Sequence, residues 1–169
     1  YIIKTIQMEN KEFTVTDGLL ASKGQRFLNC IIDLLIAYII WVCIIATIFI
    51  FAQITNDYAL SEKIKSMSVL MQCLSGAVIM IFYYILMETY FSRSIAKYFT
   101  KTMVVMRNGS KPNVATVIKR TLCRFIPLEP FTFLSTGRGW HDAFSHTYVV
   151  KKHEFNDKKR LFSSVVEIL

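Results

Sequence analysis

Two long stretches without any charged residue restrict this chain to folds that a lipid bilayer can accommodate. Residues 34–56 and residues 66–87 contain no Asp, Glu, Lys or Arg. As helices rising about 1.5 Å per residue they would extend roughly 34 and 33 Å, against about 30 Å for the hydrocarbon core of a bilayer. The sequence therefore predicts a mainly α membrane protein built on a two-span helical hairpin, with spans at about residues 27–54 and 66–91. A mean hydropathy of +0.40 and a charged fraction of 19% also exclude a disordered chain.

The charges indicate how the hairpin is oriented. Eighteen of the twenty Lys and Arg residues lie outside the hairpin's connecting loop, on the side of its two ends. The loop itself, residues 57–65, carries two acidic and two basic residues and has no net charge. By the positive-inside rule we expect both termini in the cytoplasm and this loop outside. The net charge of +8 then favours contact with anionic lipid headgroups on the cytoplasmic side over nucleic-acid binding.

Short β-branched segments flank the hairpin and predict a small cytoplasmic β element. The candidates are residues 1–8, 102–106 and 147–150, of which we expect at least two to share one sheet. Residues 1–20 are interpreted as an N-terminal strand and linker. Residues 153–169 are interpreted as a basic C-terminal tail.

Residues 114–134 predict a third helical segment that does not cross the bilayer. Three cations within it (Lys119, Arg120 and Arg124) would each cost about 2.5 to 3.5 kcal/mol at the centre of a span. Two prolines interrupt the helix. We expect this segment to lie in the membrane interface or to form a shallow re-entrant turn.

A group of polar residues marks the end of the hairpin where the chain enters and leaves the bilayer. Arg26, Asn29 and Asp33 follow the i, i+3, i+7 spacing that places them on one face of a helix. Asp33 directly precedes the first apolar run, and a carboxylate within a membrane segment is costly and usually functional. The antiparallel second helix brings Glu88 and Arg93 to the same end.

These residues resemble a known family. Arg26, Asp33 and Asp142, the last in GRGWHDAFSHTYVV, match the three residues that name the RDD family of bacterial membrane proteins. Residues 89–109 (TYFSRSIAKYFTKTMVVMRNG), which include Lys97, resemble the family's segment with a T-x-G-K signature followed by a T-x-V-V strand, although Ala96 replaces the usual Gly. TLCRFIPLEPF, which includes Arg124, resembles the family's R-T-x-x-R stretch. The resemblance covers about residues 20–152, and we take residues 21–152 as the membrane domain.

The resemblance implies a bacterial inner-membrane location but no settled activity. Some members of the family are associated with sodium–proton antiport, and some work beside other membrane or soluble modules. Arg26, Asp33 and Asp142 are accordingly the signature polar cluster, which Asn29, Glu88, Arg93, Lys97 and Arg124 would support.

Two interpretations of function follow. In the first, the chain is a membrane subunit or adaptor that binds another membrane protein or a second copy of itself, and a small-residue patch around Gly76 and Ala77 permits close helix contact. In the second, Asp33 carries a proton or cation in a transporter. Two helices cannot enclose a pathway, so transport would require an oligomer.

An enzyme is the least supported class of function. The sequence has no nucleophile elbow, phosphate-binding loop or zinc-protease motif. His141 and His146 are five residues apart, which does not place them on one helical face, and no third metal ligand is evident. We therefore predict no catalytic residue, no metal and no cofactor.

Overall fold

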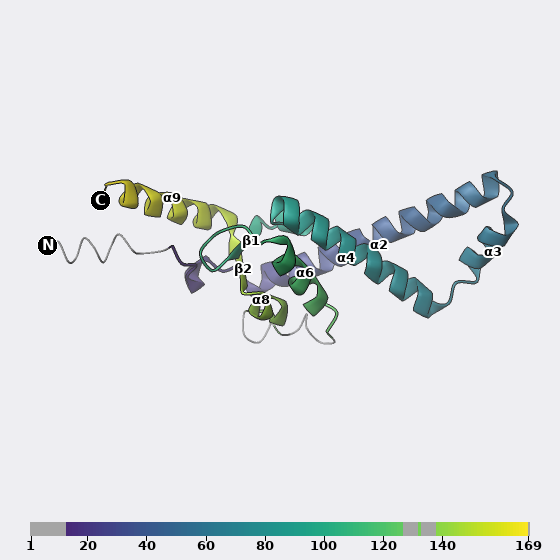
Figure 1. The fold of residues 1–169 in the computed structure, drawn as a ribbon, viewed down its shortest axis with the longest axis horizontal. Coiled ribbons are helices and arrows are strands. Elements are labelled where there is room, and N and C mark those ends of the chain that lie inside the picture. Colours follow the sequence, from purple (N-terminus) through teal and green to yellow (C-terminus); the bar gives the residue numbers. More distant parts are fainter. Residues whose placement is uncertain (1–12, 127–131, 133–137, 169) are drawn as a thin grey trace.

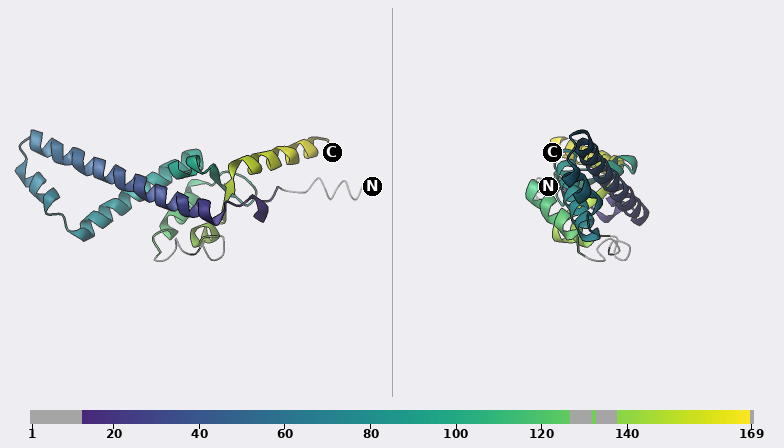
Figure 2. Two further views of the ribbon diagram at one scale, coloured as in Figure 1. Left: turned by 180° about the vertical axis from the view of Figure 1, so that it is seen from behind. Right: turned by 90° about the vertical axis from the view of Figure 1, so that its right-hand side faces the viewer.

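A computed structural model describes residues 13–126, 132 and 138–168 of the 169-residue chain. The molecule is elongated and mostly helical: two long helices form a hairpin at one end, and the shorter elements gather at the other (Figure 1). We call this second end the base of the hairpin. The described N-terminal residues and the last helix both extend from the base, as the views in Figure 2 also show.

The hairpin consists of α2 (Lys23–Ile54) and α4 (Val69–Phe91). Both helices are long and apolar enough to cross a membrane. The predicted spans at 27–54 and 66–91 fall on these two helices. α2 begins at a capping box, in which the Ser22 hydroxyl accepts from the backbone N–H of Gln25 and the Gln25 side chain accepts from the backbone N–H of Ser22.

The loop between the spans contains a helix that hydropathy does not predict. α3 (Tyr58–Lys65) begins where the Asp57 carboxylate accepts from the backbone N–H of Leu60. α3 packs against the end of α2, where Ser61 and Ala52 are both buried. The second span therefore starts only at Val69, where Ser68 caps α4.

Two short strands pair at the base. β1 (Thr102–Met106) and β2 (Thr147–Lys151) are antiparallel, with Thr102 opposite Lys151 and Met106 opposite Thr147. The predicted strands at 102–106 and 147–150 are confirmed as members of one sheet, whereas the predicted strand at 1–8 lies outside the described residues.

Short helices surround the sheet and link it to the hairpin. They are η1 (Asp17–Leu19), α5 (Ile95–Phe99), α6 (Val114–Cys123) and α8 (Trp140–Phe144). The ten residues of α6 extend about 15 Å, too short to cross a bilayer. α6 packs against α4 and α8 and turns its basic face inward: Arg120 is fully buried, whereas Ile118 and Leu122 are exposed.

Residues 152–168, most of the segment interpreted as a tail, form α9 (Lys152–Ile168), which continues directly from β2. Phe155 on this helix joins a buried core with Leu19, Val105 and Val150. The Phe13 ring meets the Phe155 ring edge to face at 5.6 Å between centroids. Phe155 is the buried apolar residue of α9 among those described, whereas Leu161, Val165 and Val166 are exposed.

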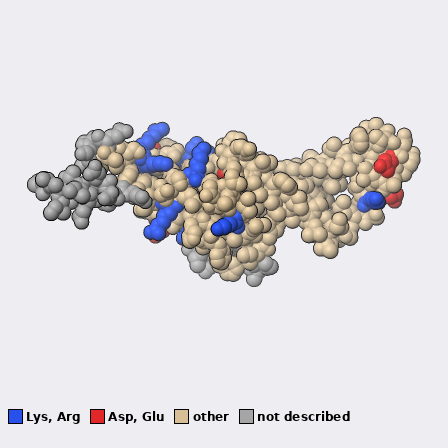
Figure 3. Space-filling view, in the orientation of Figure 1, with Lys and Arg blue, Asp and Glu red and all other residues tan. Residues whose placement is uncertain are grey.

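Charge is unevenly distributed along the molecule (Figure 3). Several Lys and Arg side chains lie on the face of the base that is in view, a long uncharged surface follows along the hairpin, and a few acidic and basic side chains reappear at the tip around α3. This pattern is typical of a membrane protein with its basic end at one bilayer surface.

Candidate functional site

Seven charged residues from five separate elements converge at the base of the hairpin, and we call them the charge cluster. Six of them are buried, at 5% exposure or less, and the seventh has a side chain that is 10% exposed. The cluster comprises Arg26 and Asp33 from α2, Glu88 from α4, Lys97 from α5, Arg120 and Arg124 from α6 and its C-cap, and Asp142 from α8.

Asp142 is held by two arginines. Arg26 Nη1 donates to its Oδ2 and Arg120 Nη1 donates to its Oδ1. Arg120 Nη1 also lies 2.6 Å from the Thr147 hydroxyl, at the start of β2. Burial by itself would raise the pKa of Asp142, but Arg120, His141 and Arg26 hold that pKa well below its usual range. Asp142 is therefore an anion that ties the start of α2 to α6 and α8.

Glu88 forms ion pairs with three cations. Its Oε1 accepts from Lys97 Nζ at 3.0 Å and from Arg124 Nη2 at 2.8 Å. Its Oε2 lies 3.0 Å from Arg120 Nε. Arg120 therefore bridges Glu88 and Asp142, and the two carboxylates belong to one continuous network.

Burial and the contact with Glu88 act in opposite directions on the pKa values of Lys97 and Arg124. Burial lowers the pKa of Lys97, and Glu88 opposes that shift. Burial also disfavours the charged form of Arg124, but the interactions with Glu88, Tyr84 and Asp33 together outweigh this effect and raise the Arg124 pKa. The guanidinium of Arg124 lies 3.7 Å from the centre of the Tyr84 ring, a cation–π contact.

Asp33 has a different role from the other two carboxylates. Its Oδ1 accepts from the Tyr83 hydroxyl at 2.7 Å and from the backbone N–H of Ala96 at 3.2 Å. The backbone N–H of Ile95 donates in turn to the Tyr83 oxygen at 3.0 Å. The N-cap residue of α5, Ser94, makes no side-chain capping bond, so Asp33 and Tyr83 cap α5 from other helices.

The structure shows how the three signature residues are paired and what the replacement of the family's usual Gly by Ala96 does. Arg26 pairs directly with Asp142, whereas the contacts of Asp33 are to Tyr83 and to the backbone of Ala96. Ala96, which replaces the family's usual Gly, is fully buried, and its backbone still reaches Asp33. Alanine at this position therefore still lets the backbone of α5 come within hydrogen-bond distance of Asp33.

Among the proposed supporting residues, all but one contribute to the site. Asn29 accepts from the Thr100 hydroxyl at 2.6 Å and donates to the Thr102 hydroxyl at 3.1 Å, which joins α2 to the start of β1. The guanidinium of Arg93 instead contacts Tyr98, 4.6 Å from the centre of the ring.

Two central residues escaped the sequence analysis. Arg120 entered it only as a charge that opposes a membrane span, yet it is fully buried and joins both carboxylates. Arg120 and Arg124 are spaced i, i+4, which places both cations on one face of the helix. This spacing could have indicated from sequence that they share a site. Tyr83 was not a candidate site residue, although it is buried and bonded to Asp33.

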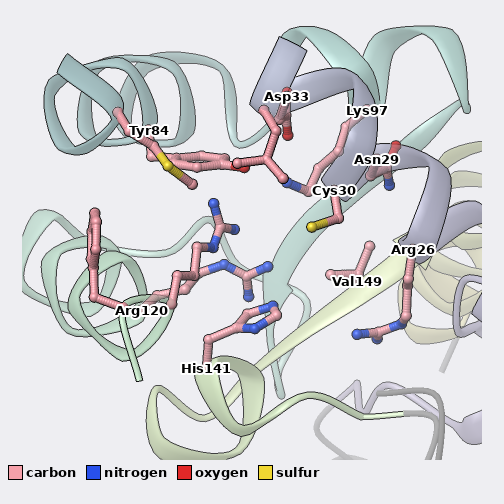
Figure 4. A pocket seen from close by; sticks show the side chains of 13 residues that line it. Arg26, Asn29, Cys30, Asp33, Tyr84, Lys97, Arg120, His141 and Val149 are labelled. Atoms are coloured by element: carbon pink, nitrogen blue, oxygen red, sulfur yellow. The ribbon is translucent and has the colours of Figure 1, made fainter. Parts of the chain in front are cut away.

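A cavity of about 230 Å3 opens among these side chains. Figure 4 shows Arg26, Arg120 and His141 reaching toward it from α2, α6 and α8, with Asp33 and Lys97 on the opposite side. Within the described residues, no group of three or more His, Cys, Asp or Glu side chains is arranged to hold a metal ion.

Comparison with known proteins places this arrangement in a family. The model of the RDD family matches residues 20–150, the range that contains the hairpin, β1, all of β2 except Lys151, and every member of the charge cluster. Searches of curated proteins and of solved structures gave no significant match. The matched range covers most of the chain, and its two apolar helices fit a membrane protein. The chain therefore belongs to the RDD family.

Proposed function

We propose that this RDD family protein is a non-catalytic membrane subunit or adaptor of a bacterial inner membrane, with both ends in the cytoplasm. Its hairpin would bind another membrane protein or a second copy of the chain. The observation that carries the proposal is that the charge cluster is engaged within the fold. Its three carboxylates hold α2, α4, α5, α6 and α8 together.

The hairpin supplies the surface for such a partner. α2 has very little of its apolar length covered by the rest of the chain. The indole N–H of Trp41 donates to the Ser75 hydroxyl at 2.8 Å, and Gly76 lies beside the same ring, so the small-residue patch serves contact within the hairpin itself. Beyond this crossing the two helices diverge toward α3 (Figures 1 and 2). The diverging outer halves are where an additional helix would find apolar surface.

Photo-cross-linking in native membranes tests the proposal. A photoreactive amino acid replaces Ile50, which is 57% exposed on the outer half of α2, and in a matched control it replaces Leu161, which is 67% exposed on α9. We expect the Ile50 variant to form a discrete protein adduct, identified by mass spectrometry, at a yield that the Leu161 variant does not match. Products with lipid alone at Ile50 would contradict the proposal.

Cation or proton transport through Asp33 is the alternative, and the contacts of Asp33 favour the structural role. Both of its bonded donors belong to the fold itself, and the 21 residues of α2 that follow it toward the tip include no Asp, Glu, His, Lys or Arg. We expect vesicles that contain only this protein to show no Na⁺, K⁺ or H⁺ flux above empty liposomes. A flux that Asp33→Asn abolishes in a folded protein would establish transport instead.

A further inference from the structure

The cavity in the charge cluster combines a cationic floor with an apolar rim. Its basic lining residues are Arg26, Lys97, Arg120 and Arg124, together with His141. On the side of the hairpin, the lining changes to apolar side chains: Leu34, Met80 and Phe125. Leu34 is 48% exposed and Phe125 is 41% exposed, so this rim lies at the surface of the protein.

Several guanidinium donors on the floor have no hydrogen-bond acceptor. Within the described part of the chain, Nε and Nη2 of Arg26, Nη2 of Arg120 and Nη1 of Arg124 are buried without a hydrogen-bond partner. Arg26 is 5% exposed and Arg120 is fully buried, so bulk water does not replace the missing acceptors. Unpartnered buried donors are costly, and acceptor oxygens in the cavity would remove that cost.

The formal charge of the cluster also favours an anion. Its four Lys and Arg side chains face three carboxylates, which leaves one uncompensated positive charge. Guanidinium groups present parallel N–H donors that match the oxygens of phosphate groups. A singly charged phosphate diester would balance the charge and accept from the free donors.

A second cavity, of about 320 Å3, adjoins the first and continues along the hairpin. Leu34 and Met80 line both cavities. The second continues between α2 and α4 past Ala37 and Gly76 to Trp41, about 10 Å along the axis of α2 at 1.5 Å per residue. Its lining is largely apolar, and it leads away from the charged base. A ligand that filled both cavities would therefore have an anionic head and a hydrocarbon tail.

We propose that the two cavities bind one phospholipid with an anionic headgroup. The phosphate would accept from the unpartnered guanidinium donors of Arg26, Arg120 and Arg124, and one acyl chain would lie between α2 and α4. Basic pockets between membrane helices on the cytoplasmic side are suited to such headgroups. The proposal does not depend on the adaptor function, because a transporter could bind the same lipid.

Native mass spectrometry of the full chain in mild detergent tests the proposal. The probes are dioleoyl phosphatidylglycerol, which is anionic, dioleoyl phosphatidylcholine, which has the same chains on a zwitterionic headgroup, and glycerol 3-phosphate, which has no chains. Arg26→Lys keeps a cation for Asp142 but removes the two free donors of Arg26. Leu34→Trp obstructs the junction of the cavities, and Leu35→Trp, at a residue that is 56% exposed, is its matched control outside both cavity linings.

We expect the wild type to bind phosphatidylglycerol at least about tenfold more tightly than phosphatidylcholine. Arg26→Lys should weaken phosphatidylglycerol binding by about tenfold for the loss of one charged hydrogen bond. Leu34→Trp should weaken it by a similar factor through lost chain burial, whereas Leu35→Trp should leave it unchanged. If Arg26→Lys does not fold, the two leucine variants still decide the question.

Three results would overturn the proposal. Equal affinity for the two lipids would show that the cationic floor does not read the headgroup. Equal effects of Leu34→Trp and Leu35→Trp would show that the lipid binds elsewhere. Glycerol 3-phosphate binding as tightly as phosphatidylglycerol would show that the site takes a soluble phosphate and that the apolar cavity plays no part.

Discussion

The same chemical change at two buried carboxylates should have very different consequences for stability. Glu88→Gln removes the anion that three cations share, because Lys97, Arg120 and Arg124 all contact it. The amide oxygen could keep two of these contacts, but the amide NH2 would then face the Nε of Arg120, and two donors would meet at 3.0 Å. Breaking a buried ion pair by removing one partner costs about 3–5 kcal/mol of unfolding free energy.

Asp33→Asn should cost far less. Both donors to Asp33, the Tyr83 hydroxyl and the backbone N–H of Ala96, bond to the same oxygen, Oδ1. An asparagine oxygen in that position accepts from both, so the capping of α5 is retained. The loss is the difference between a charged and a neutral acceptor, about 1 kcal/mol.

Reversible unfolding in mixed detergent–SDS micelles, followed by circular dichroism, measures both variants. Glu62→Gln on α3 is the control for the chemical change, because this carboxylate is 70% exposed and its substitution should leave stability almost unchanged. Equal destabilisation by Glu88→Gln and Asp33→Asn, or a larger effect of Asp33→Asn, would refute the different roles assigned to these carboxylates.

Three further predictions follow from the structure. Because the pKa of Asp142 is held well below its usual range, its stabilising contribution is complete above the unfolded-chain value of about 3.9 and is lost as the pH falls below it. The difference in unfolding free energy between wild type and Asp142→Asn should therefore shrink as the pH falls below about 4. His153 on α9 has a side chain that is 89% exposed. In a variant without the native cysteines, a cysteine introduced by His153→Cys should not react with an impermeant thiol reagent added to intact cells, whereas one introduced by Lys63→Cys in α3 should be labelled. Labelling at residue 153 would place α9 on the outer side of the membrane. Gly109→Ala should lower the free energy of unfolding by about 1–2 kcal/mol or more, because Gly109 has φ +72° and a Cβ there would lie 2.8 Å from the Phe13 ring. An unchanged unfolding midpoint would contradict this left-handed conformation at Gly109.

The hairpin and the strands were predictable because their signals are local. An uncharged run of sufficient length defines a span wherever it packs, and the β-branched residues of β1 and β2 favour strands by themselves. The boundary position of Arg26 and Asp33 was also evident from hydropathy. The partner of Arg26, by contrast, lies 116 residues away, and only the family resemblance indicated it.

What the sequence could not supply was the inward orientation of α6. A helix with several cations and an apolar face normally turns its charges to water. Here Arg120 faces the protein interior because it forms ion pairs with Glu88 and Asp142 there. That outcome depends on tertiary contacts between α4, α6 and α8. α9 was missed for a different reason: its charge favoured a solvated tail, although the i, i+7 spacing of Phe155 and Phe162, which both contact Phe13, is a helical signal.

The central claim is that the charge cluster holds the base to the hairpin. The ion pair between Arg26 on α2 and Asp142 on α8 makes this connection directly. A double-mutant cycle with Arg26→Gln and Asp142→Asn measures that link through the unfolding free energies of wild type, both single variants and the double variant. We predict that the double variant is less destabilised than the sum of the single variants by about 1–3 kcal/mol, because each single change leaves a buried charge without its partner. A coupling free energy near zero would contradict the claim.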